Sequence, residues 1–148
     1  MKAMTFPAAR FFAAALACVV LTMTASGEER EVGETFCERA NLGVTTAKSE
    51  VSLPDGARVD CIVDYPLASF AVEIDRSRKW AECIGQALLY GIDSKAGAVC
   101  ALFQDSQTTD KSFTNHIDRA KRVIDSLKEA GIKITLFCIA TDGKPKTC

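Results

Sequence analysis

Acidic, basic and amide side chains are grouped in the stretch VEIDRSRKWAECIGQALLY, which begins like a strand and continues like a helix. Glu73 and Asp75 lie two residues apart and therefore share one face of a strand. Lys79, Gln86 and Tyr90 follow at spacings that place them on one face of a helix. Because a helix starting just after Asp75 points its first turns back towards the strand end, we expect the Lys79 ammonium group to lie near both carboxylates. Such carboxylates suit a hard cation.

Two further acidic residues, Glu50 and Asp60, lie in short apolar-rich runs on either side of Pro54-Asp55-Gly56. That tripeptide predicts a hairpin turn, because proline presets φ and glycine adopts positive φ. In a hairpin symmetric about Asp55, Glu50 lies opposite Asp60 on the same face of the sheet. Like charges in direct opposition destabilise a hairpin, so the pair indicates a compensating cation.

The acidic residues form one predicted cluster if the third strand pairs with the second. The members of this cluster are Glu50, Asp60, Glu73 and Asp75. Because no histidine is among them, they favour Mg²⁺, Mn²⁺ or Ca²⁺ over zinc. The alternative interpretation is a set of ordinary solvated faces, with Lys79 and Glu82 as surface charges. Acidic residues are depleted in strands, so their matching positions favour a site over that alternative.

The remaining hydrophobic pattern predicts the elements that must position these residues. We expect residues 28–34 to be frayed. We predict helices at 35–47, 76–92 and 111–130, and strands at 50–53, 58–63, 70–75, 97–103 and 132–140. The repeated strand–helix–strand order implies parallel pairing after an initial meander. The expected fold is therefore α/β, with a mixed central sheet flanked by helices.

Residues 1–27 have the features of a secretory signal peptide: early positive charge, an apolar run and small residues before Glu28. The apolar run is shorter than the about 20 residues that a membrane-spanning helix needs. We therefore predict export without stable membrane association. A lipoprotein site at Cys18 is a weaker alternative, because that cysteine lies inside the apolar run. The expected protein is secreted or periplasmic, with one domain over residues 28–148.

An even number of cysteines remains after removal of the signal peptide, which predicts disulfides in an exported domain. The absence of CxxC spacing and the single histidine disfavour a zinc site and a redox role. The sequence does not choose among the possible connectivities, although we expect a bridge at Cys148 to hold the tail. The candidates are Cys37, Cys61, Cys83, Cys100, Cys138 and Cys148.

In their order and spacing, these residues resemble the PD-(D/E)xK nuclease superfamily. The matching pieces are Glu50, Arg58-Val59-Asp60, Glu73-Ile74-Asp75 with Lys79, and Gln86-Ala87-Leu88-Leu89-Tyr90. The last piece is similar to the QxxxY motif of the RecB-like exonucleases in that superfamily. The resemblance extends over roughly residues 35–140. It implies a restriction-endonuclease-like core of order α-β-β-β-α-β, here with a further helix and strand.

The resemblance also implies a role for each site residue. Asp60 and Glu73 are expected to bind Mg²⁺ or Mn²⁺, and Glu50 to act as an outer acid through water or a second metal ion. Gln86 and Tyr90 are expected to steady the site or to contact the nucleic-acid backbone. Together these roles imply metal-assisted hydrolysis of phosphodiester bonds.

One position departs from the superfamily motif. The motif has lysine two residues after Glu73, where this chain has Asp75. Lys79, one helical turn further on, is the natural substitute for orienting the attacking water, and Asp75 is then a candidate additional metal ligand. If Lys79 points elsewhere, we expect a site that binds metal without hydrolysing a substrate.

Two functions of different classes follow from the sequence. The first is an exported, metal-dependent nuclease with DNA as its substrate. The second is a catalytically inactive, disulfide-bonded binding module of the same fold that recognises an envelope protein. A net charge of −1 with no basic run leaves any affinity for a nucleic-acid backbone to a local patch. The sequence leaves open the oligomeric state and the choice between DNA and RNA.

Overall fold

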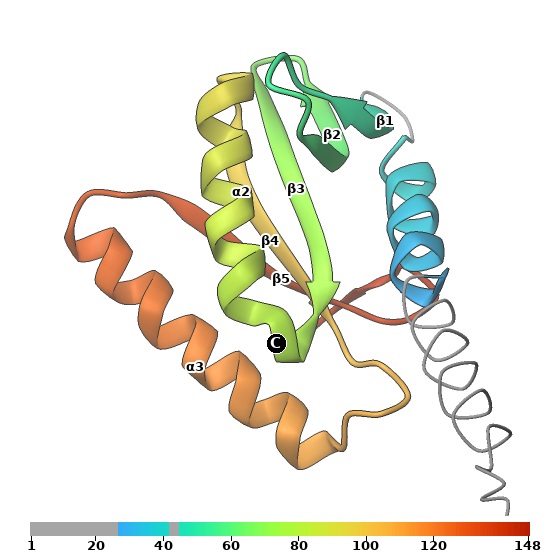
Figure 1. Cartoon of the computed structure of the whole chain (residues 1–148), viewed down its shortest axis with the longest axis vertical. Coiled ribbons are helices and arrows are strands. Elements are labelled where there is room, and N and C mark those ends of the chain that lie inside the picture. The colour runs from blue at the N-terminus through green and yellow to red at the C-terminus, as the bar shows by residue number, and fades with distance from the viewer. Residues whose placement is uncertain (1–26, 42–44) are drawn as a thin grey trace, which may run out of the picture.

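Six strands form one mixed sheet in the computed structural model, which describes residues 27–41 and 45–148 (Figure 1). β1, β2 and β3 pair antiparallel, β3, β4 and β5 pair parallel, and β5 and β6 pair antiparallel. The strands are β1 (Thr46–Ser52), β2 (Arg58–Tyr65), β3 (Ala68–Arg76), β4 (Gly97–Phe103), β5 (Ile134–Ile139) and β6 (Pro145–Lys146). This arrangement confirms the predicted α/β fold with a mixed sheet. The two-residue β6 is an addition to the predicted order.

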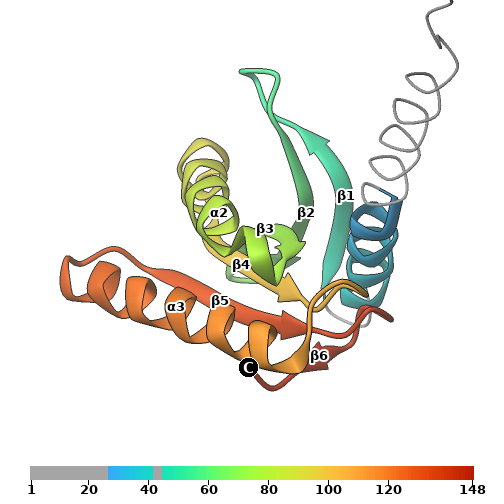
Figure 2. The same cartoon turned by 60° about the horizontal axis from the view of Figure 1, so that its bottom comes forward.

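Helices cover both faces of this sheet. Residues 27–40 are helical, and the later helices are α2 (Trp80–Ser94), which follows the 3₁₀ turn η1 (Ser77–Lys79), and α3 (Asp110–Glu129). α2 connects β3 to β4 and α3 connects β4 to β5, so each helix is a crossover between parallel strands. Figure 2 shows α2 and α3 on one side of the sheet and the helix of residues 27–40 on the other.

An apolar core on each face holds the layers together. On the side of α2 and α3, Ile84 and Ile117 belong to the same buried cluster as Leu102 of β4. On the other side, Val32 of the N-terminal helix is buried in one cluster with Ile74 of β3. Alternate residues of β3 and β4 thus point into different cores, as strand geometry requires.

The hairpin between β1 and β2 has the predicted register. Gly56 adopts a φ of 88°, and its N–H donates to the carbonyl of Leu53 at 3.0 Å, which closes the turn. The neighbouring pairs are Ser49 with Cys61, Val51 with Val59 and Ser52 with Arg58. Glu50 falls between two of these pairs and is therefore opposite Asp60 by count. The pairing is interrupted at this residue.

The N-terminal helix corrects two expectations. Residues 28–34 are helical rather than frayed, because Val32 is buried against the sheet and Phe36, one helical turn later, packs against the same cluster. The helix predicted at 35–47 is therefore placed too late, since β1 already begins at Thr46. The predicted signal peptide and Cys18 lie outside the described residues, apart from Gly27, so that prediction stays a prediction.

α2 continues past the predicted end at residue 92 to Ser94 and is capped by Lys95 with a φ of 56°. Gly91 therefore lies inside the helix rather than at its end. Gly91 instead lets the helix approach β4 closely. A Cβ atom at this position would lie 3.1 Å from the Ala98 Cβ and 3.1 Å from the Ala96 carbonyl oxygen. We infer that this glycine serves packing rather than helix termination.

All six cysteines among the described residues form disulfides, which confirms the prediction for these positions and for the tail. The pairs are Cys37–Cys61, Cys83–Cys100 and Cys138–Cys148, with Cα–Cα distances of 5.7, 5.6 and 5.1 Å. They tie the N-terminal helix to β2, α2 to β4, and the C-terminus to β5. Such bonds indicate an oxidising compartment. Within the described part of the chain, no helix has the length and apolar character needed to cross a membrane.

Candidate active site

Asp60 marks the point at which β2 and β3 separate. The pairing of the two strands ends at Cys61 and Val72, and β3 continues beside β4 alone. The Asp60 carboxylate replaces the missing strand, since its Oδ2 accepts a hydrogen bond from the Ile74 N–H at 2.8 Å. This bond fixes the carboxylate at the opening between the two strands.

Glu73 and Asp75 follow on β3, on the face that α2 covers. Their partners in β4 are Cys100 and Leu102, which belong to the core under α2. Only 7% of Glu73 and 2% of Asp75 is exposed. The Oε2 atom of Glu73 is buried without a hydrogen-bond partner among the described residues. Because an unpaired buried carboxylate oxygen is unfavourable, this position favours a cation or a proton.

Burial raises the pKa of all three carboxyl groups: to about 6 for Asp60, about 9 for Glu73 and about 7 for Asp75. At Glu73, the charges of Asp60 and Asp75 add to the effect of burial. At Asp75, the charge of Glu29 adds to it, whereas the ammonium group of Lys79 opposes it. In the absence of a bound cation, burial and mutual repulsion therefore favour the protonated, neutral form of these carboxyl groups.

Lys79 points into this acidic group. It is the last residue of η1, and its Nζ lies 3.2 Å from Asp75 Oδ1 and 3.5 Å from Glu29 Oε1. Burial alone lowers the pKa of Lys79, but the charges of Asp75 and Glu29 outweigh it and hold the pKa above its ordinary value. The ammonium group thus stays charged beside the carboxylates, as the sequence spacing predicts. With 38% of its side chain exposed, it is also accessible from solvent.

The N-terminal helix supplies a further acidic side chain, Glu29, that the sequence-based interpretation missed. Besides its contact with Lys79, Glu29 Oε2 lies 3.7 Å from a guanidinium nitrogen of the buried Arg76. The spacing of Val32 and Phe36 predicts a buried helix face here. Packing of that face on the sheet places Glu29, one helical turn before Val32, near the site.

Glu50 does not join the other acids in one metal-binding group. Its backbone adopts a φ of 54°, and its Oε2 lies 2.6 Å from Nε of Arg58, which neutralises it locally. Its charge still raises the pKa of Asp60. The convergence of Glu50, Asp60, Glu73 and Asp75 on one metal ion therefore stays a prediction: in residues 27–41 and 45–148, no group of three or more acidic, histidine or cysteine side chains is placed to hold a metal ion by itself.

Gln86 and Tyr90 differ in their surroundings. Gln86 lies towards the surface of α2, where its Nε2 donates to Glu82 Oε1 at 3.4 Å. Tyr90 is buried in one cluster with Val59 and Ala71. Burial raises the pKa of Tyr90, and the charges of nearby acidic groups raise it further. Tyr90 thus packs against β2 and β3 beside the site, while its proposed contact with nucleic acid stays a prediction.

A hydrogen bond between Ser77 and His116 ties α3 to the turn that carries Lys79. Ser77 Oγ and His116 Nδ1 lie 3.1 Å apart, and Ser77 is fully buried. The sequence assigns no role to this histidine because no partner motif accompanies it. The contact restrains η1, so it helps to place the Lys79 ammonium group.

The metal-free protein is expected to lose stability as pH rises from 5 to 8. In this range Glu73 keeps, in the folded protein, a proton that its unfolded form has released, because folding raises its pKa to about 9. The unfolded chain then binds fewer protons, so the free energy of unfolding falls with pH, by about 1.4 kcal/mol per pH unit for each proton held. Urea unfolding in EDTA at several pH values measures this slope.

Glu73→Gln is the matched variant for that measurement. It removes the titrating group without changing the shape of the side chain, so its slope should be flatter than that of the wild type. A wild-type protein that becomes more stable between pH 5 and pH 8, or a variant with an unchanged slope, would contradict the proposed electrostatics of the site.

No protein-family model, curated protein or solved structure matches this chain.

Proposed function

We propose that the protein is an exported nuclease that hydrolyses phosphodiester bonds of DNA with Mg²⁺ or Mn²⁺. The observation that carries the proposal is the placement of two carboxylates, the half-buried Asp60 and the buried Glu73, where β2 and β3 separate, with the Lys79 ammonium group nearby. This is the site composition that the resemblance to the PD-(D/E)xK superfamily implies. The order of the helix and strands from residue 27 to β4 also agrees with a restriction-endonuclease-like core.

The acidic residues fit a divalent cation. Glu73 Oε2 is buried and has no hydrogen-bond partner among the described residues, and burial raises the pKa of Asp60 and Glu73. Mg²⁺ commonly takes only one or two protein carboxylates and fills its other positions with water and phosphate oxygens. Asp60 and Glu73 would supply those carboxylates, so a larger cluster of protein ligands is not required. The bound ion would polarise the scissile phosphate and lower the pKa of the attacking water.

The chain's own residues would then position the reacting groups. Lys79 carries a charged, partly exposed ammonium group, which donates hydrogen bonds to an attacking water or to a phosphate oxygen. Asp75 and Glu29 hold this group from two sides. Tyr90 supports β3 from the side of α2. Lys79 thus takes the place of the motif lysine that is absent at residue 75.

Export is part of the proposal because the disulfides require an oxidising compartment. Residues 1–27 provide the predicted signal peptide for secretion or for delivery to the periplasm. An enzyme in that location meets DNA outside the cytoplasm.

Incubation of the purified protein with plasmid DNA tests the proposal directly. We expect hydrolysis in Mg²⁺ or Mn²⁺ and none in EDTA, with the products followed on agarose gels. Asp60→Asn, purified in the same way, controls for contaminating nucleases. Activity that survives in that variant, or a wild type that leaves DNA intact in both metals, would exclude DNA hydrolysis at this site.

The inactive binding module is the second candidate, and the specific observation in its favour is Asp75 at the motif's lysine position. In that case Lys79 only neutralises Asp75 and Glu29. The protein would then leave DNA intact but would gain thermal stability from Mn²⁺, because the buried carboxylates would still bind the ion.

A further inference from the structure

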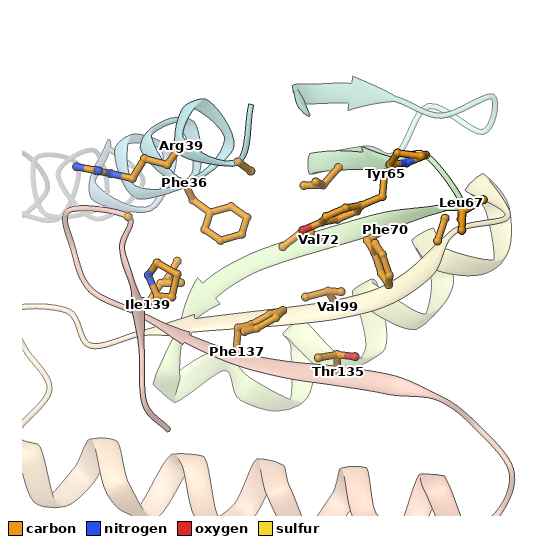
Figure 3. Close-up of a pocket in the computed structure, with 16 residues that line it drawn as sticks. Phe36, Arg39, Tyr65, Leu67, Phe70, Val72, Val99, Thr135, Phe137 and Ile139 are labelled. Carbon is orange, nitrogen blue, oxygen red and sulfur yellow. The ribbon is translucent and has the colours of Figure 1, made fainter. Parts of the chain in front are cut away.

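The sheet face opposite α2 and α3 carries an apolar cavity of about 780 Å³. This volume lies within the range of about 300–1,000 Å³ that is typical of small-molecule sites. Valine side chains form its floor and aromatic side chains stand around them, as Figure 3 shows. The residues on which the argument depends are Phe36, Val63, Phe70, Val72, Val99 and Phe137.

The sequence explains why this space is open. The helix of residues 27–40 covers one end of the sheet face, and Val63, Val72 and Val99 share the uncovered part with Phe70 and Phe137. Phe70 is held upright at the side of the cavity. Its ring lies so close to Gly97 that a Cβ there would be 2.7 Å from a ring carbon, and it packs edge-on against Tyr65 at 5.7 Å. These contacts hold the Phe70 ring in place, so this wall of the cavity is preformed without a ligand.

The two ends of the cavity differ in charge. Arg39 of the N-terminal helix lies at one end with its guanidinium group directed outwards, and Leu67, with 99% of its surface exposed, lies at the other (Figure 3). Arg39 Nε donates to the carbonyl oxygen of Asp142 at 3.0 Å, and the carboxylate of Asp142 pairs with Lys144 at 2.8 Å. The charge of Arg39 also contributes to lowering the pKa of Asp142. No ion pair among the described residues includes Arg39, and no acidic residue lines the cavity.

We propose that this cavity binds a long-chain carboxylic acid, with its acyl chain over the valine floor and its carboxylate at Arg39. An elongated apolar space with a single guanidinium group at one end is complementary in charge to a ligand with one anionic head and one apolar tail. The exposed Leu67 extends the apolar surface beyond the far end, where a longer chain would emerge. This site lies on the opposite sheet face from Glu73 and Asp75 and does not depend on the proposed hydrolysis.

Titration of the purified, naturally processed protein with cis-parinaric acid, a fluorescent fatty acid, tests the proposal. We expect saturable fluorescence enhancement, and displacement by palmitate at lower concentration than by hexadecanol. Arg39→Leu should weaken palmitate binding by about tenfold and leave hexadecanol unchanged, because only the carboxylate uses the guanidinium group. Competition titrations give both values.

Two variants test the apolar part of the site. Phe137→Glu and Leu67→Glu place a charge on side chains that are already 44% and 99% exposed, so folding should be preserved while binding of both lipids is lost. Ile92→Glu, on an exposed apolar residue of α2 outside the cavity, is the matched control and should bind normally. Thermal unfolding of each variant checks that it is folded.

Three results would overturn the proposal. The first is an absence of saturable binding to the wild type. The second is a preference for palmitate over hexadecanol that persists in Arg39→Leu, since the guanidinium group would then not recognise the head group. The third is a wild-type dimer in sedimentation experiments that Phe137→Glu converts to a monomer, because a second copy of the chain would then occupy the cavity.

Discussion

Replacement of Glu73 by glutamine should reduce DNA hydrolysis by on the order of 10³-fold while leaving the protein folded. Glutamine keeps the shape of the side chain but cannot supply the negative charge that a bound cation needs. It also removes a buried carboxyl group whose pKa is raised to about 9. The variant should therefore be at least as stable as the wild type in EDTA at pH 8. Single-turnover cleavage of a labelled duplex, together with urea unfolding, measures both effects.

Glu82→Gln is the control for this experiment. Glu82 is exposed on the first turn of α2 and makes its side-chain contact with Gln86. The Glu82→Gln variant carries the same chemical change at a position outside the buried carboxyl groups, so cleavage should stay within about twofold of the wild type. If Glu73→Gln cleaves DNA as fast as this control, the carboxylate has no part in hydrolysis. A variant that loses both cleavage and stability would instead assign Glu73 a structural role.

Much of the fold follows from local patterns in the sequence. The Pro54-Asp55-Gly56 turn predicts the hairpin register, because proline and glycine restrict the backbone strongly enough to fix the pairing on both sides. β4, at Gly97–Phe103, has its predicted bounds because it is a short apolar run between two turns. These elements depend on neighbours in sequence, which is the information that a single chain provides.

The less predictable parts depend on contacts between distant segments. Glu29 reaches the site because Val32 and Cys37 bury the N-terminal helix on the sheet, and its acidic composition concealed this packing. Glycine commonly ends helices, whereas Gly91 lies inside α2 where the helix closely approaches β4. Disulfide pairing likewise requires the fold, since spacing alone is compatible with many connectivities.

The candidate site shows the same division. Strand alternation correctly places Glu73 and Asp75 on one face, and the turn that directly follows the strand brings Lys79 to Asp75, as predicted. Neither pattern contains the left-handed backbone of Glu50 or its ion pair with Arg58. Strand register therefore predicts which residues lie opposite each other, but not which of their charges are neutralised by an ion pair.

Replacement of Lys79 by methionine should lower DNA cleavage by on the order of 10²-fold with little effect on metal affinity. Methionine keeps most of the length of the side chain and removes only the ammonium group that lies 3.2 Å from Asp75. If the group orients water or stabilises developing charge, the rate of the chemical step falls, while the Mn²⁺ concentration for half-maximal thermal stabilisation changes little. Single-turnover rates and thermal shifts over a Mn²⁺ titration separate these effects.

Exchange of the two charges gives the sharper form of this test. Asp75→Lys combined with Lys79→Asp keeps the net charge and restores lysine two residues after Glu73, where the superfamily motif has it. If Lys79 performs the work of that lysine, the double variant should cleave DNA faster than Lys79→Met. Lys128→Met, which removes an exposed ammonium group on α3, should cleave at the wild-type rate. A Lys79→Met enzyme as active as Lys128→Met would mean that Lys79 only neutralises Asp75 and Glu29, and that the attacking water is oriented without it.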